Sequence, residues 1–493
     1  MASLVRPLAG FRSSALRIIK PSFTCTSCLR KEARHASPLN YAVRRLNINH
    51  SYPRRTSVAA SISEAASISK SVSPEGSKSS SESSRKYPEI SDKKVAYWLI
   101  GSAASVFGIV VFGGLTRLTE SGLSITEWRP VTGSLPPTSQ EAWTSEYDKY
   151  RSSPEFQRLN PNMSLEEFKK IYWMEWGHRL WGRVIGVSFL LPTMYFIARR
   201  RISPRTALRL TAISGLIGLQ GFVGWWMVKS GLKDDLFAPG SYPRVSQYRL
   251  TVHLGLAFVV YALMLTSGLR ILRAHRLLKS PADSQKLLAT LRSPVVRHFR
   301  IATAAVAALV FTTAMSGALV AGLDAGLIYN EFPYMGLGLT PPSPELWDPH
   351  YSQQEDQSDL VWRNMTANPS LVQLDHRILA MTTTAAVFGL WVYGKRRGGR
   401  LRAMLPRDVH RGLNGLTHLV MAQVTLGITT LLYLVPTWLA AGHQAGSLAL
   451  LTGALVLRNR LGVSSKVVNL VKMKVKQGGK GVGGRPVMPL RKS

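Results

Sequence analysis

Four histidines, His178, His253, His376 and His443, are the side chains in this chain whose type and spacing best suit chemistry. Each lies in the first few residues of a hydrophobic stretch long enough to cross a membrane. These stretches are the second, fourth, sixth and eighth of eight, so all four imidazoles are expected on one side of the bilayer at similar depth. An imidazole inside a membrane needs a polar partner or a metal. Two matched pairs therefore predict two bis-histidine metal centres.

Haem suits such a pair best, because two axial imidazoles complete the coordination of its iron. A non-haem metal site would need three or more close ligands, and each pair supplies two. The sequence has no Cys-x-x-Cys-His, so covalent attachment of haem is excluded.

The elements that must position these histidines are membrane helices. Each apolar stretch has about the twenty residues needed to cross the hydrocarbon, and Gly, Ala, Ser and Thr are frequent, which favours close helix packing. The predicted class is an all-α integral membrane protein. The expected spans are roughly 95–114, 178–198, 206–228, 248–270, 299–323, 376–394, 412–435 and 437–457.

Charge in the loops predicts their orientation. The segments after spans two, four, six and eight are strongly basic, whereas 324–375 contains eight acids and one base, Arg363. The positive-inside rule then places both termini on the inner side of the membrane and the two long loops on the outer side. With the mitochondrial transit peptide expected at residues 1–55, these sides are the matrix and the intermembrane space. The excess of 62 Lys and Arg over 27 Asp and Glu reflects this topology, and we expect no nucleic acid as a partner.

The chain repeats itself with a period near 200 residues. His178 matches His376 at an offset of 198, and Gln220 matches Gln423 at an offset of 203. Each unit has four spans, so both copies insert the same way up and the repeat is parallel. The predicted architecture is two tandem four-helix bundles, each with one histidine pair in its core.

Six segments are expected along the chain. Residues 1–55 have eleven Arg or Lys and one acid, which is typical of a mitochondrial transit peptide, although its cleavage site stays open. The segments are the transit peptide 1–55, a Ser-rich disordered linker 56–94, the N-terminal bundle 95–270, a basic matrix linker 271–298, the C-terminal bundle 299–457 and a basic matrix tail 458–493.

The repeat differs one helical turn above each first histidine. Glu175 precedes His178 by three residues, and the neutral Gln373 precedes His376 by the same spacing. A residue at i−3 shares the histidine's helix face, so Glu175 could act as acid or base, or stabilise a developing cation, beside the first metal centre. The alternative is a structural Glu175 bonded to a loop amide. Arg179 and Arg377 would either bind haem propionates or extend to water.

Five stretches of the membrane region resemble the haem A synthase family in its mitochondrial form. They keep their order between about 95 and 460, and several are long and unusual. They are GGLTRLTESGLSITEWRPVTGSLPP (113–137), EWGHRLWGR (175–183), VSQYRLTVHLGLA (245–257), VQLDHRILA (372–380) and LAAGHQAGSLALLTGAL (439–455).

The resemblance implies oxidation of the C8 methyl of haem O to a formyl group by successive hydroxylation, giving haem A for cytochrome c oxidase. It implies haem O as substrate at His178 and His253 with Glu175 as the essential carboxylate. It also implies a haem b cofactor at His376 and His443. The expected location is the mitochondrial inner membrane, with the haem sites near the intermembrane-space face.

The partners implied are haem O synthase (a farnesyltransferase), a ferredoxin with its reductase, cytochrome c oxidase assembly factors and the lipid bilayer, and a homo-oligomer stays open. Two other functions remain: a dihaem b-type electron-transfer protein and a haem delivery or assembly factor. A six-coordinate substrate haem has no open position for dioxygen. Either one N-terminal histidine leaves the iron, or the methyl loses electrons and water captures a cation stabilised by Glu175.

Overall fold

Long apolar helices dominate the structure, a computed structural model that describes residues 87–129, 135–238, 241–396, 398–462 and 464–480. The predicted transit peptide 1–55 and most of the linker predicted at 56–94 lie outside the described residues. Eight of the helices within these ranges have the length and hydropathy of membrane spans, as predicted. The described residues contain no strand, apart from an isolated bridge between Met335 and Gly338.

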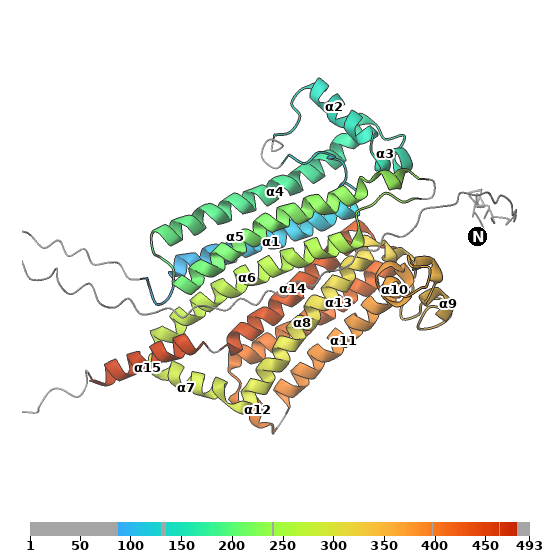
Figure 1. The fold of residues 1–493 in the computed structure, drawn as a ribbon. Coiled ribbons are helices and arrows are strands. Elements are labelled where there is room, and N and C mark those ends of the chain that lie inside the picture. Colours follow the sequence, from blue (N-terminus) through green and yellow to red (C-terminus); the bar gives the residue numbers. More distant parts are fainter. Residues whose placement is uncertain (1–86, 130–134, 239–240, 397, 463, 481–493) are drawn as a thin grey trace, which may run out of the picture. The chain divides into compact units, whose positions relative to one another are not determined.

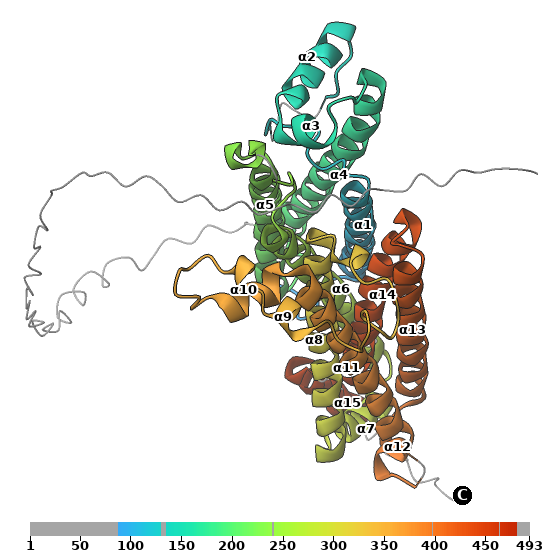
Figure 2. The same ribbon diagram turned by 90° about the vertical axis from the view of Figure 1, so that its right-hand side faces the viewer.

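The eight long helices form the two predicted four-helix bundles (Figure 1). In each bundle the first helix packs on the second and fourth, and the third helix packs on the same two. The two bundles contact each other in two places. The fourth helix of the N-terminal bundle packs on the first helix of the C-terminal bundle, and α1 packs on α14 (Figure 2). The N-terminal bundle contains α1 (Lys93–Leu118), α4 (Leu165–Ala198), α5 (Pro204–Val228) and α6 (Gln247–Lys279). The C-terminal bundle contains α8 (Pro294–Gly322), α11 (Pro369–Lys395), α13 (Arg407–Leu432) and α14 (Thr437–Leu461).

Local sequence explains where these helices begin. Ser164 and Glu167 form a capping box at the start of α4, which satisfies backbone donors that have no partner inside the helix. Proline occupies the first position of α5, α8 and α11, where its missing N–H costs nothing. The outward face of α4 is apolar and exposed, as expected of a helix that lipid covers. Its exposed apolar residues include Val184, Val187, Leu190, Leu191 and Met194.

The short helices divide between the two ends of the bundles (Figure 1). One end has α2 (Gln140–Arg151), α3 (Pro154–Leu159), α9 (Ser343–Leu346) and α10 (Leu360–Ala367), all from the two long acidic loops. The other has α7 (Pro281–Arg292), α12 (Arg400–Met404) and α15 (Ser465–Lys480). The segment predicted as the linker 271–298 is itself largely helical. Part of the predicted tail is also helical, because α15 buries Val468 and Val471 against Leu277 and Leu288.

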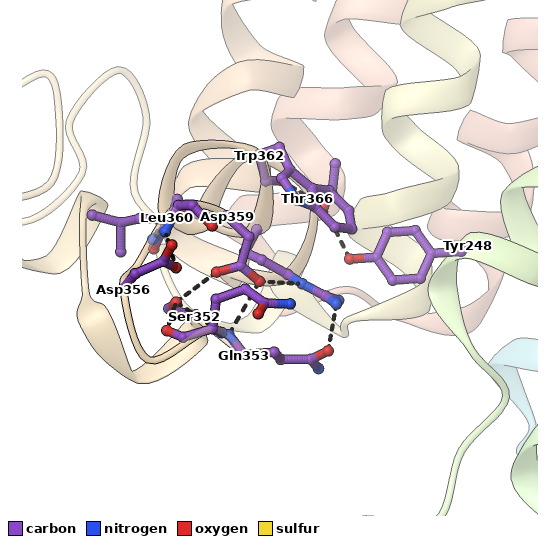
Figure 3. Close-up of polar contacts among 12 residues, drawn as sticks. Tyr248, Ser352, Gln353, Asp356, Asp359, Leu360, Trp362 and Thr366 are labelled. Atoms are coloured by element: carbon purple, nitrogen blue, oxygen red, sulfur yellow. Dashed lines mark hydrogen bonds and ion pairs between the residues drawn. The ribbon is translucent and has the colours of Figure 1, made fainter. Parts of the chain in front are cut away.

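The second acidic loop folds over the seam between the bundles. Asp359 accepts hydrogen bonds from Ser352 and Gln353 and pairs with Arg363, which closes the loop on itself (Figure 3). From α10, Thr366 then meets the hydroxyl of Tyr248 on α6 at 3.0 Å. The loop of one bundle is thus fastened to a helix of the other.

Candidate functional site

The C-terminal histidines face each other. His376 on α11 and His443 on α14 have ring centroids 6.4 Å apart and planes inclined at 88°. A metal–imidazole bond is about 2 Å long, so two rings on one metal have centroids roughly 6 Å apart. The pair therefore has the separation that bis-histidine ligation requires.

The N-terminal histidines occupy the equivalent helices, α4 and α6. His178 lies against Gly113 of α1 and His253 against Gly224 of α5, and these two helices each pack on both α4 and α6. The structure therefore brings together the same pairs that the sequence predicted, although ligation of haem by them stays a prediction.

A glycine on the neighbouring helix makes room for each imidazole. A Cβ added at any of these glycines would lie 2.9 to 3.0 Å from a ring atom, which is closer than nearly all real Cβ contacts. The contacts pair Gly113 with His178, Gly224 with His253, Gly317 with His376 and Gly427 with His443. The glycines repeat with the histidines, so each half has two imidazoles held in matching glycine-lined recesses, an arrangement that fits a haem between them.

Polar side chains next to three of the rings were not assigned a role from the sequence. Gln220 Nε2 donates to the backbone carbonyl of His253 at 3.0 Å and lies 3.2 and 3.4 Å from the two nitrogens of its ring. Gln423 Nε2 donates to the backbone carbonyl of His443 at 2.9 Å and lies 3.2 and 3.5 Å from its ring nitrogens. Ser316 Oγ lies 2.8 Å from His376 Nδ1. Such outer contacts orient a ligand imidazole. The sequence feature that could have revealed these contacts is the repeated glutamine inside an apolar span, because a side-chain amide in the membrane must find a polar partner.

Glu175 is buried and fully hydrogen-bonded. Its Oε2 accepts from Ser124 Oγ and from the backbone N–H of Ile125, both at 2.7 Å. Its Oε1 accepts from Arg179 Nη2 at 2.6 Å and from Nε at 3.0 Å. The contact to a loop amide, considered as the structural alternative, is therefore present.

The C-terminal bundle has the equivalent contact with donor and acceptor exchanged. Gln373 Nε2 donates to the backbone carbonyl of Tyr329 at 2.9 Å, and Tyr329 is the repeat equivalent of Ile125. The arginines are also equivalent, because Arg179 donates to Ile125 O at 2.8 Å and Arg377 to Tyr329 O at 3.0 Å.

Both arginines thus hold the outer loops. Arg179 also donates to Glu127 O, and Arg377 to the carbonyls of Glu331 and Tyr334. The predicted propionate contacts would have to use donors that these loops leave over, such as Arg377 Nε, which has no partner within the described part of the chain.

The family model described as cytochrome oxidase assembly protein, COX15-CtaA, matches residues 96–455, which cover both bundles. The chain belongs to the COX15-CtaA family. Heme A synthase COX15 of Saccharomyces cerevisiae is 52% identical over 370 residues, covering 75% of each chain. Heme A synthase COX15 of Homo sapiens is 44% identical over 370 residues, covering 75% of this chain and 83% of the human one.

A third relative is the heme A synthase–mitochondrial ferredoxin fusion protein of Schizosaccharomyces pombe. It is 51% identical over 377 residues, which cover 76% of this chain and 61% of the fusion protein. From these relatives, this protein is a haem A synthase, which is an oxidoreductase. The mitochondrial relatives and the eight spans make it a mitochondrial membrane protein.

Proposed function

We propose that this member of the family oxidises the C8 methyl of haem O to a formyl group and so makes haem A. The observation that carries the proposal is one charge difference between two sites that match in their imidazoles, their glycine recesses and their arginine-held loops. Each half has two imidazoles, two glycine recesses and an arginine-held loop, but Glu175 in the first half is Gln373 in the second. The substrate is assigned to His178 and His253, and a resident haem b to His376 and His443.

The loop contact does not require a carboxylate. Gln373 holds Tyr329 with a neutral amide, whereas Glu175 holds Ile125 with a charged group that needs Arg179 beside it. Burying an ion pair brings little net stability, because desolvation offsets the attraction. The charge at Glu175 therefore points to a chemical role, in which the carboxylate takes a proton or stabilises positive charge as the methyl is oxidised.

Two successive hydroxylations give a balanced reaction. The first converts the methyl to a hydroxymethyl group, and the second gives a hydrated aldehyde that loses water to form the formyl group. With dioxygen as oxidant, the total is R–CH3 + 2 O2 + 4 e− + 4 H+ → R–CHO + 3 H2O. Haem b at His376 and His443 would supply one-electron transfer. The electrons would come from a ferredoxin and its reductase, which the fused ferredoxin of the S. pombe relative supports.

The cellular setting follows from the same proposal. The protein would span the mitochondrial inner membrane with both termini in the matrix and its haem sites near the intermembrane space. Haem O synthase would supply the substrate, and cytochrome c oxidase assembly factors would receive the product. The basic and acidic ends of the bundles support this orientation by the positive-inside rule.

The test is to extract and weigh the haems of cells that carry Glu175→Gln. We expect haem O or a hydroxylated intermediate to accumulate while the protein retains its haem b. Glu127→Gln is the matched control, because Glu127 belongs to the same loop but pairs with the exposed Arg129; it should still make haem A. Unchanged haem A in Glu175→Gln would indicate a dihaem carrier or delivery factor instead. His376→Ala with full haem b would contradict the C-terminal assignment.

A further inference from the structure

A groove of about 300 Å³ lies on the seam between the two bundles, where α6, α8 and α14 pack against one another (Figure 1). Its lining is apolar apart from one arginine, and three of the four α8 residues in it are alanines. Leu451 and Leu455 of α14 are buried and form its floor, whereas Val259 and Leu263 of α6 are 38% and 37% exposed at its edge. The groove therefore opens to the side of the seam that lipid covers.

The same seam is closed at the acidic end of the bundles. There Gly322 of α8 lies directly against Gln247 of α6, because a Cβ added at Gly322 would be 2.6 Å from the Gln247 Cβ. The lining residues belong to the other half of each helix, near the start of α8 and the end of α14. The groove is thus a gap between the bundles toward their basic end.

Three arginines mark the basic end of this groove. Arg458 of α14 is part of the lining. Arg270 on α6 and Arg297 on α8 each lie two helical turns from a lining residue, Leu263 and Ala304 respectively, and so share its helix face.

The charge of these arginines is not neutralised locally. All three are exposed, and within the described part of the chain none of their guanidinium groups has a hydrogen bond or an ion pair. The three helices α6, α8 and α14 contain no Asp or Glu at all. An anion would therefore meet three guanidinium groups with free donors at the end of an apolar groove.

The length of the groove matches one leaflet of a bilayer. Val259 and Arg270 are about 16 Å apart along α6, at about 1.5 Å per residue. Half of the hydrocarbon core of a membrane is about 15 Å thick. An acyl chain lying along the groove would therefore have its headgroup at the level of the arginines, where a phosphate can accept hydrogen bonds from guanidinium groups.

We propose that this groove binds one phospholipid with an anionic headgroup. Its acyl chain would pack on Leu451 and Leu455, and its phosphate would lie among Arg270, Arg297 and Arg458. Basic pockets between membrane helices bind anionic lipid headgroups in this way. A second copy of the chain would suit the groove less well, because copies inserted the same way up would bring two sets of arginines together. The lipid would hold α6 against α8 at the basic end, as the contact between Tyr248 and Thr366 does at the acidic end.

Native mass spectrometry of the purified full-length protein tests this, with tetraoleoyl cardiolipin and dioleoyl phosphatidylcholine as the added lipids. The two probes have the same acyl chains, but only cardiolipin has a net negative charge. Wild-type protein should bind one cardiolipin at least tenfold more tightly than phosphatidylcholine. The double variant Arg270→Gln/Arg458→Gln should weaken cardiolipin binding about tenfold or more. Arg205→Gln/Arg402→Gln is the matched control, because these exposed arginines of α5 and α12 lie at the same end but outside the lining.

A second variant leaves every charge in place and fills the groove instead. Ala308→Leu adds volume at an exposed lining position and should lower cardiolipin binding severalfold, whereas Ala305→Leu, exposed on the same helix outside the lining, should not. Cardiolipin should also raise the thermal unfolding midpoint of the wild type more than that of Ala308→Leu. Equal binding of the two lipids, or wild-type cardiolipin binding in both test variants, would overturn the proposal. A dimer in the same spectra that Ala308→Leu converts to a monomer would overturn it in favour of a second copy.

Discussion

Gln444, the residue after His443, donates its Nε2 hydrogen to the backbone carbonyl of Val110 at 2.8 Å. Val110 lies on α1, so this bond joins the C-terminal histidine pair directly to the N-terminal bundle. One turn further along α1, Gly113 contacts His178, and Gly114 leaves space for the Gln444 side chain. The two sites are therefore neighbours across a seam of small residues.

Gly114→Ala tests this seam. Its Cβ would lie 1.8 Å from Gln444 Oε1, so the glutamine would have to leave its place or the helices would have to separate. We expect a loss of about 1–3 kcal/mol in stability, typical of overpacking, measured as a lower thermal unfolding midpoint in detergent. Gly101→Ala is the control, because nothing lies within 4 Å of its added Cβ on the same helix. Equal midpoints for both variants would refute a close seam.

Gly427→Ala addresses the recess around His443. The new Cβ would lie 2.9 Å from His443 Cε1 and should displace the ring. Because ligand geometry controls metal affinity, we expect haem b per protein to fall severalfold, measured by pyridine haemochrome. Gly415→Ala on the same helix meets nothing within 4 Å and should retain its haem. Full haem in Gly427→Ala would show that the recess does not matter.

Glu155 on α3 predicts a pH dependence of stability. It is 3% exposed, and its Oε2 has no partner within the described residues. Its pKa is raised from 4.5 to about 8, mainly by burial and also by the nearby carboxylates Glu175 and Glu120, whereas Arg117 lowers it. Because the folded state binds this proton more tightly, its contribution is complete below pH 4.5 and is lost as the pH rises through 8.

In Glu155→Gln, the thermal unfolding midpoint should therefore change less with pH between pH 5 and 9. At the alkaline end of this range the variant should be more stable than the wild type. The measurement is a thermal unfolding series across that range in detergent. Glu166→Gln, on the exposed first turn of α4, should keep the wild-type profile. A Glu155→Gln profile that follows the wild type would show that the Glu155 carboxyl does not titrate abnormally.

Arg377→Leu should loosen the second outer loop. It removes the donors to three backbone carbonyls, those of Tyr329, Glu331 and Tyr334. Hydrogen bonds to charged groups are worth about 1.5–3 kcal/mol each, and less where they are exposed, as those to Glu331 and Tyr334 are. The three together should still slow opening of the loop, so we expect about tenfold faster cleavage between 328 and 340 by limited proteolysis. Arg276→Leu, at the opposite end of the bundles, should leave cleavage unchanged, and equal rates in both variants would argue against this anchoring.

Much of the fold could be predicted because its determinants are local or periodic. A span needs about twenty apolar residues in a row, and a duplication repeats its residues at a constant offset, so neither depends on knowing which helices touch. His376 and His443 could be paired for the same reason. Helix ends were less predictable: α4 begins at Leu165, well before the apolar run, because the capping box at Ser164 starts it outside the membrane.

The roles of the polar residues around the site were less accessible. Arg179 and Arg377 were expected to bind propionates or extend to water, but the structure has them on loop carbonyls some fifty residues away in the chain. Glu155 gave no sequence signal, because a glutamate in a polar loop is normally exposed. Its burial results from the aromatic cluster formed by Tyr150, Phe156, Phe168 and Tyr172.

By itself, the sequence determined that the chain crosses a membrane eight times, that its two halves are copies, and that four histidines lie toward one side. These follow from hydrophobicity, charge and repetition, which are properties of the chain before it folds. Only the tertiary structure decided which glycines receive the imidazoles, that Gln444 joins the two bundles, and that Arg179 and Arg377 hold the outer loops. Those relationships depend on which helix faces meet, and packing between distant segments sets that choice.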